Sequence, residues 1–209
     1  VVVSVLVISS SADAHVFATS KVMSFSDYAN ANHIPLKSVK DQFSASGKLV
    51  CPAYTGTAQV TGSANILTTS AHLFYDKSCK QVAIERCTFE PLFSHEKYHL
   101  VPKGSHIGLC LIETPNTSDD WAVVYIDRPV KGVTPYKIPD FPVSTDLNNN
   151  LTVVAASARN ISHSPFIVKC RARDQGYYPN IDEMDDCSTD SGGSGSAQLV
   201  PEPRGWKLV

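Results

Sequence analysis

Serine, histidine and aspartate side chains stand in three separate stretches of the sequence, each beside an apolar run. His72 ends the run NILTTSAH, and Asp120 directly precedes the run WAVVYI. The glycine-rich stretch DCSTDSGGSGSAQLV carries two candidate nucleophiles, Ser191 and Ser194. A hydroxyl, an imidazole and a carboxylate brought into one site perform acyl transfer. A carboxylate entering an apolar strand is costly to bury unless it is hydrogen-bonded, and an imidazole N–H is a suitable donor.

The elements that would position these residues are predicted to be short β-strands. The runs GTAQVTG and ANILTTSAH alternate in polarity and are separated by Gly62-Ser63, which predicts a hairpin. The proline-rich segment 128–146 is the expected boundary between two halves. Many short strands with few helices favour barrels or a sandwich. Further strands are expected at 105–113, 120–129, 151–158, 165–174, 196–200 and 205–209.

The N-terminal part of the sequence has a different residue pattern. Residues 1–14, VVVSVLVISSSADA, match the end of a secretory signal; the alternative is a buried first strand. Residues 26–43 are the most helical part, with Ser26 as a candidate cap and Leu36, Val39 and Phe43 on one face. We interpret 15–47 as a partly helical pre-domain or propeptide. A DNA-binding helix-turn-helix is disfavoured because the segment is not basic.

Composition bounds the function classes. The 209 residues are 43% hydrophobic and 18% charged, which is ordinary for a globular protein with a sizeable core. The net charge of −2 gives no electrostatic reason to expect nucleic acid or an acidic membrane surface. No run beyond the first residues approaches the length of a membrane span, so we expect no stable membrane association.

Six cysteines in an exported chain suggest up to three disulfides and a secreted or periplasmic location. None has C-x-x-C spacing, so no metal site is expected. Cys170 and Cys187 enclose a modest loop and are expected to pair. The other four allow three pairings, of which we favour Cys51–Cys79 and Cys87–Cys110.

Two of the three stretches resemble blocks of the chymotrypsin-like serine peptidases. GTAQVTGSANILTTSAH resembles the hairpin that carries the catalytic histidine, with Ser70-Ala71-His72 where the family typically has Ala-Ala-His. DDWAVVYI resembles the strand that follows the catalytic aspartate. Asp120 is the match there, and Asp119 is the alternative.

The third stretch resembles the nucleophile loop of the bacterial glutamyl-endopeptidase-like branch of secreted trypsin-like peptidases. The family forms its oxyanion hole from the N–H groups of the nucleophile and of the residue two before it, usually glycine. That earlier residue is Gly192 if Ser194 attacks, and Thr189 if Ser191 attacks. Trp206, twelve residues after Ser194, also falls at the family's spacing. We therefore choose Ser194, which leaves no basis for trypsin-like Arg or Lys specificity.

The resemblance implies an all-β fold of two Greek-key β-barrels, with His72 and Asp120 in a first barrel over 48–130. Ser194 would lie in a second barrel over 131–209, which we expect to be incomplete at its C-terminus. The implied protein is a secreted, monomeric serine endopeptidase that hydrolyses protein or peptide substrates through a His72-Asp120-Ser194 triad without a cofactor. The alternative is a catalytically inactive binding or regulatory protein of the same fold.

Overall fold

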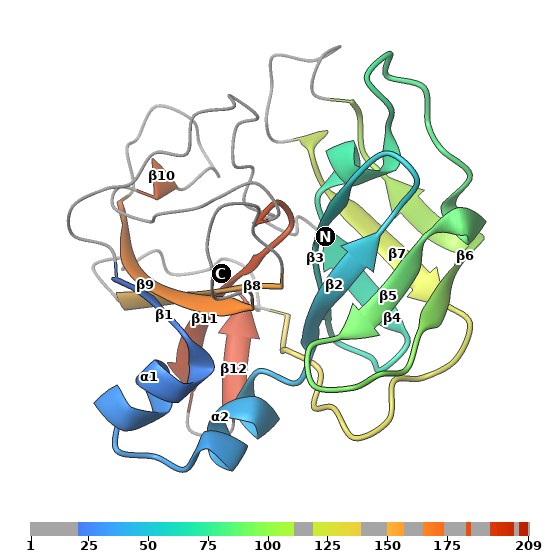
Figure 1. Ribbon diagram of the computed structural model, residues 1–209. Helices are drawn as coiled ribbons and strands as arrows, with labels where there is room; N and C mark the ends of the chain where they lie inside the picture. The colour runs from blue at the N-terminus through green and yellow to red at the C-terminus, as the bar shows by residue number, and fades with distance from the viewer. Residues whose placement is uncertain are drawn as a thin grey trace.

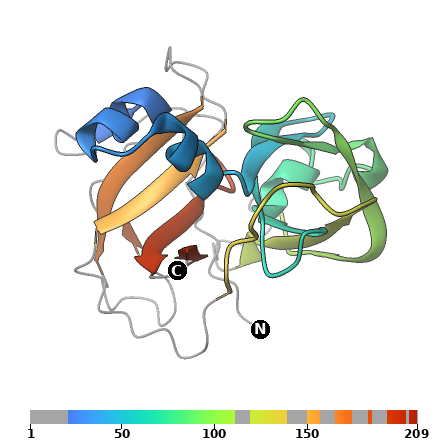
Figure 2. The same ribbon diagram turned by 90° about the horizontal axis from the view of Figure 1, so that it is seen from below.

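A closed barrel lies beside an open sheet, with two short helices packed along the sheet (Figures 1 and 2). The all-β prediction is confirmed, and the second unit is an open sheet in the part of the chain that is described. The computed structural model describes residues 21–110, 119–138, 150–156, 165–173, 183–184, 193–202 and 205–208.

The barrel is antiparallel, and its six strands are ordered β2-β3-β4-β7-β6-β5. Alternate residues point inward, so Leu49, Ala58, Leu67, Phe89 and Val124 are completely buried. These strands are β2 Ser46–Val50, β3 Thr55–Val60, β4 Ile66–Thr69, β5 Thr88–Pro91, β6 Tyr98–Ile107 and β7 Ala122–Ile126.

The predicted hairpin is confirmed. Strands β3 and β4 pair antiparallel with Val60 opposite Leu67, and Gly62 has a φ of 67° in the connection between them. Glycine adopts such a positive φ without steric cost, which is why the Gly62-Ser63 pair signals the turn. The hairpin brings β4, and the chain that follows it, to a defined place in the barrel wall.

The strand predicted at 105–113 is placed too late. The structure has β6 at Tyr98–Ile107, with an irregularity in its pairing to β7 between Val101 and His106. The alternation that defines this strand begins at Tyr98 and Leu100, whose side chains are buried. The strand was predicted too far toward the C-terminus because several residues after Ile107 are apolar. An apolar run by itself does not show where strand pairing ends.

The second unit is a sheet of six strands ordered β1-β9-β8-β11-β12, with β10 also paired to β9. Its buried side includes Val154, Ile167 and Leu199, which are part of the hydrophobic core. The strands are β1 Lys21–Met23, β8 Asn150–Ala155, β9 Phe166–Arg173, β10 Glu183–Met184, β11 Ala197–Glu202 and β12 Gly205–Leu208.

The N-terminal segment forms two helices, α1 Phe25–Ala31 and α2 Leu36–Gln42. The chain breaks between them where His33 has a φ of 54° and Pro35 precedes the first residue of α2. The predicted cap at Ser26 is wrong, because Ser24 caps α1 by accepting the N–H of Asp27 at 3.0 Å. Leu36 also differs from the prediction, since it is 37% exposed.

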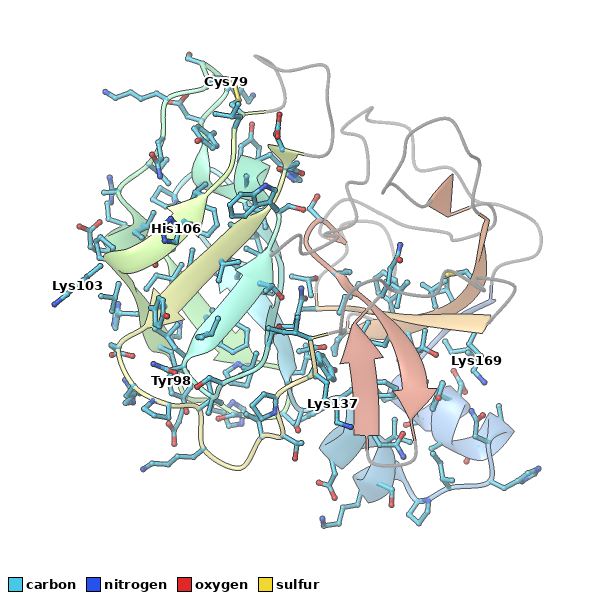
Figure 3. All side chains as sticks on the ribbon, turned by 180° about the vertical axis from the view of Figure 1, so that it is seen from behind. Cys79, Tyr98, Lys103, His106, Lys137 and Lys169 are labelled. Carbon is cyan, nitrogen blue, oxygen red and sulfur yellow. A yellow bond between two sulfur atoms is a disulfide. The ribbon has the colours of Figure 1, made fainter. Side chains whose placement is uncertain are left out.

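The two helices are packed into the body of the fold. Val39 and Phe43 of this segment are completely buried, and Phe25 makes edge-to-face contacts with Phe43 and with Phe93 of the barrel. On the sheet, β1 pairs with β9, and Lys169 of β9 lies over the Tyr28 ring at 5.0 Å. Figure 3 shows Lys169 where the sheet meets the helices. The segment therefore contacts both units.

The favoured disulfide pairing of the first four cysteines is wrong. The structure joins Cys51 to Cys87 and Cys79 to Cys110. Strands β2 and β5 pair with Val50 opposite Thr88, so the next residues, Cys51 and Cys87, face each other with 4.3 Å between their Cα atoms. The pairing of two strands that are distant in the sequence therefore determines this disulfide. The spacing of the cysteines along the chain does not predict it.

The second bridge lies at one end of the barrel, where Figure 3 labels Cys79. Cys79 has a φ of 57° in a tight turn, and the Tyr75 hydroxyl donates to the Gly108 carbonyl at 2.7 Å. These contacts bring the chain after His72 close to Cys110. Cys170 is also disulfide-bonded. Cys187 lies outside the described residues, so its pairing with Cys170 stays a prediction.

The barrel topology predicts the result of a non-reducing peptide map. Peptides carrying Cys51 should be linked to Cys87, and peptides carrying Cys79 to Cys110, which mass spectrometry identifies. Replacing both Cys51 and Cys87 by Ser should lower the free energy of unfolding by about 2–5 kcal/mol, because the bridge constrains the unfolded chain. A Cys51–Cys79 linkage in the native protein would contradict the observed strand pairing.

Candidate functional site

His72 is presented by the turn of 3-10 helix that follows β4. This turn, η1, spans Ala71–Phe74, and its residues Ala71, Leu73 and Phe74 are buried. The three buried side chains anchor the turn in the barrel, while the His72 side chain keeps 17% of its surface exposed. The buried neighbours therefore hold the backbone of His72 in place, while part of its imidazole ring remains accessible to solvent.

Asp120 holds this histidine by two hydrogen bonds. One carboxylate oxygen accepts the His72 backbone N–H at 2.7 Å, and the other lies 2.7 Å from the ring Nδ1. The Asp120 side chain is completely buried. Because the carboxylate can only accept, the geometry assigns the proton to Nδ1, and in the neutral ring Nε2 is then free to take up a proton.

Strand pairing explains why these two residues meet across 48 positions of sequence. Strands β4 and β7 pair with Thr69 opposite Ala122, so the residues after β4 and those before β7 leave the barrel at the same place. His72 follows β4 and Asp120 precedes β7. The alternative carboxylate, Asp119, uses its backbone carbonyl to accept the Leu109 N–H at 3.0 Å, and the ring pairs with Asp120.

Ser194 lies in a tight turn directly before β11. The Ser196 N–H donates to the Gly193 carbonyl at 2.9 Å, and Gly195 at the third position of this turn has a φ of 78°. A type II turn requires a positive φ at that position, which favours glycine. The Ser194 residue is partly exposed, whereas Gly193, Gly195 and Ser196 are buried. The turn therefore presents one serine of the glycine-rich stretch.

This turn is bonded to the barrel beside the histidine. The Thr57 N–H of β3 donates to the Ser194 carbonyl at 2.8 Å. Gly195 lies so close that an added Cβ would collide with Thr69 Oγ1 and the Thr57 carbonyl, and would stand 3.1 Å from the Ser70 nitrogen. Thr69 and Ser70 lead directly into η1. Contacts across the two units thus place the Ser194 turn against the segment that carries His72.

The remainder of the predicted nucleophile loop lies outside the described residues. This includes Gly192, the second predicted oxyanion donor, and the alternative nucleophile Ser191. Downstream of the turn, β11 and β12 form a hairpin with Pro201 opposite Trp206, close to the strands predicted at 196–200 and 205–209. Among the described residues, no group of three or more His, Cys, Asp or Glu side chains could hold a metal ion. No helix in the same part of the chain is long and apolar enough to span a bilayer.

Sequence reasoning missed the threonines at the contact between the two units. Thr57 and Thr69 are completely buried, and the Thr69 hydroxyl donates to the Thr57 carbonyl at 2.7 Å. Both stand in strands that the sequence predicts, and alternation indicates the face on which each lies. Alternation does not indicate that this face meets a loop more than a hundred residues away. Threonine is common in strands, so its residue type carries no further signal.

Two substitutions next to Ser194 test whether the stability of this turn depends on close packing or on a side-chain hydroxyl. Gly195→Ala should destabilise the protein strongly, because the Cβ meets Thr69 and the Thr57 carbonyl and because the φ is positive. Ser196→Ala should be close to neutral, since the buried Ser196 Oγ has no hydrogen-bond partner among the described residues. Thermal unfolding of the two variants beside the wild type measures the difference. Equal melting temperatures for Gly195→Ala and the wild type would contradict the close contact.

No protein-family model matches the chain, and no curated protein matches its sequence. Solved structures do match its fold. A thermostable serine protease, AL20, from an extremophilic microorganism is similar with a TM-score of 0.61 and 13% identity, covering 79% of this chain and 82% of that one. A Glu endopeptidase is similar with a TM-score of 0.60 and 15% identity, covering 80% and 77% of the two chains.

A third similar structure is a scabies mite protein described as an inactivated protease paralogue. Its TM-score is 0.61 at 10% identity, and the match covers 81% of this chain and 80% of that one. These identities are low, so the likeness concerns the course of the backbone rather than the chemistry of any site. The structural neighbours are chymotrypsin-fold serine proteases together with an inactivated relative. The chain therefore has the chymotrypsin fold.

Proposed function

We propose that the protein is a serine endopeptidase that uses His72, Asp120 and Ser194 as its catalytic triad. The observation that carries the proposal is the pair of 2.7 Å hydrogen bonds from His72 to the buried Asp120. The turn that carries Ser194 is bonded to β3 at 2.8 Å and packs against Thr69 and Ser70, which lead into the 3-10 turn of His72. A carboxylate that fixes the tautomer of a partly exposed imidazole beside a serine is the arrangement required for nucleophilic acyl transfer.

The reaction follows from these positions. Nε2 of His72 takes the proton of Ser194 as Oγ forms a bond to the substrate carbonyl carbon. The His72 imidazolium, stabilised by Asp120, then protonates the amine as the peptide C–N bond breaks, which leaves an acyl group on Ser194. Water, deprotonated by the same imidazole, attacks the acyl carbon, and Ser194 Oγ leaves with the proton. The backbone N–H groups of Ser194 and Gly192 are the proposed donors to the oxyanion.

The substrate class is a protein or peptide chain. None of the steps requires a metal or an organic cofactor, because the bond broken is polarised by N–H donors and by proton transfer. The disulfides Cys51–Cys87 and Cys79–Cys110 support a secreted or periplasmic location, since such bridges persist in oxidising compartments.

A second candidate is a catalytically inactive protein that uses the same fold to bind a partner. The observation that favours it is the similarity to the scabies mite structure described as an inactivated protease paralogue. The chain retains a histidine, an aspartate and a serine at the proposed positions, which favours the enzyme. Both candidates share the fold, so a measurement of serine reactivity has to separate them.

A fluorophosphonate probe makes that measurement. An activated serine oxygen attacks the phosphorus and expels fluoride, so only a serine with a working base is labelled. The wild type should be labelled at Ser194 and should hydrolyse unstructured protein. Ser194→Ala should abolish both activities, whereas Ser191→Ala should keep most of each. Loss of labelling in Ser191→Ala alone would overturn the choice of nucleophile, and a folded but unlabelled wild type would favour the inactive protein.

Asp120→Asn tests the role of the buried carboxylate. The amide keeps the shape of the side chain, but it cannot both stabilise the imidazolium and accept from Nδ1 and the His72 backbone as the carboxylate does. Turnover should fall by a factor of about 10⁴, which is the loss typical of this change in serine peptidases. Steady-state hydrolysis of a peptide substrate measures it, with the melting temperature as a control for folding. Unchanged turnover would remove Asp120 from the proposed triad.

A further inference from the structure

Thr57 of β3 is bonded to three segments that are distant from one another in the sequence. Its N–H donates to the Ser194 carbonyl at 2.8 Å, and its carbonyl accepts the Thr69 hydroxyl at 2.7 Å. Its own hydroxyl oxygen accepts the Ala156 N–H at 2.9 Å. One residue thus contacts the turn of the proposed nucleophile, the strand that leads to the proposed base, and the end of β8.

These bonds are protected from water. Thr57 and Thr69 are completely buried, and Ala156 is 8% exposed. A buried hydrogen bond resists exchange with solvent, and leaving one of its groups unpaired costs the full desolvation of that group. The bonds to Ser194 and Ala156 both cross from the barrel to the second unit.

The packing around Gly195 requires the same arrangement. A Cβ on Gly195 would collide with the Thr57 carbonyl and with Thr69 Oγ1, the two atoms that bond to each other. The turn that contains Ser194 and Gly195 therefore packs directly against the two atoms of the Thr57–Thr69 hydrogen bond. Any shift of β3 relative to β4 would therefore move the atoms against which this turn packs, and Ser194 would move with them.

We propose that Thr57 is a positioning residue that sets the place of Ser194 relative to His72; this inference rests on the proposed peptidase function. The backbone of residue 57 holds the Ser194 carbonyl, and the hydroxyl holds the second unit in register through Ala156. Valine has nearly the same shape but cannot accept the Ala156 N–H, whereas serine can. A displacement of about 1 Å at a reacting group can lower turnover about 10²-fold.

The test compares Thr57→Val with a matched change, Thr61→Val. Thr61 is also a completely buried threonine beside the same strand, and its hydroxyl bonds within the barrel to Thr68 Oγ1 at 2.8 Å and to the Gln59 carbonyl. Both variants lose a buried hydroxyl from the barrel. Only Thr57→Val removes a tie to the second unit.

The readout is the second-order rate of fluorophosphonate labelling, measured well below the melting temperature of each variant. Thr57→Val should slow labelling by about 10- to 100-fold, while Thr61→Val should keep the wild-type rate even where its melting temperature falls as far. Thr57→Ser, which keeps the hydroxyl, should restore the rate to within a few-fold of the wild type. A labelled wild type with an unchanged rate in Thr57→Val would overturn the positioning role.

Native-state hydrogen exchange supplies a second readout that does not depend on activity. In Thr57→Val the amides of residue 57 and Ala156 should exchange faster, while the amide of His72, held by Asp120 at 2.7 Å, should keep its protection. In Thr61→Val the residue-57 and Ala156 amides should stay protected. If the amides of residue 57 and Ala156 exchanged at the same rate in both variants, the Thr57 hydroxyl would not be holding the second unit to the barrel. A folded wild type that the probe never labels overturns the proposed function instead, whichever way the exchange falls.

Discussion

The buried carboxylate of Asp120 is the constraint on which the site depends. A completely buried charge is stable only if its oxygens are hydrogen-bonded, and here the backbone and ring of His72 supply both donors. This requirement fixes the course of the chain on both sides, because η1 must follow β4 closely and Asp120 must stand directly before β7. The β4–β7 pairing, with Thr69 opposite Ala122, satisfies it. The carboxylate and the strand pairing therefore depend on each other.

The serine is held by a different kind of contact. His72 and Asp120 belong to one barrel, whereas Ser194 comes from the second unit and reaches the barrel through backbone hydrogen bonds. Small residues make that approach possible: Gly195 leaves room for Thr69 and the Thr57 carbonyl, and a Cβ on Gly56 would stand 2.9 Å from the Ser194 carbonyl. Divided in this way, the site can be assembled only when the two units are correctly placed. In the proposed peptidase, the stability of this contact and the reactivity of Ser194 are then linked.

Local patterns predicted the parts of this structure that depend on local interactions. Alternation and Gly62 indicated the β3–β4 hairpin, and the stretches around His72 and Asp120 stand at the strand ends that bring them together. The patterns failed where distant pairing decides the outcome. Cys51 meets Cys87 because β2 lies beside β5, and no spacing of cysteines records that neighbour. The bonds of Thr57 to Ser194 and Ala156 have the same origin. The break between α1 and α2 has a local cause, because Pro35 disfavours a helical conformation of the residue before it.

The fold alone leaves the activity open, because proteases and an inactivated paralogue are equally similar to this chain in backbone. Burial of a carboxylate is costly unless hydrogen bonds compensate it, and here the backbone and the ring of His72 supply those bonds. An asparagine would turn its NH2 donor toward one of the two His72 donors, and an apolar residue would accept from neither. Asp120 instead remains completely buried and bonded to both donors of His72. The pair therefore fixes the orientation of the His72 ring, which in the proposed enzyme leaves Nε2 to act as the base, and the reactivity of Ser194 is what separates that enzyme from the binding protein.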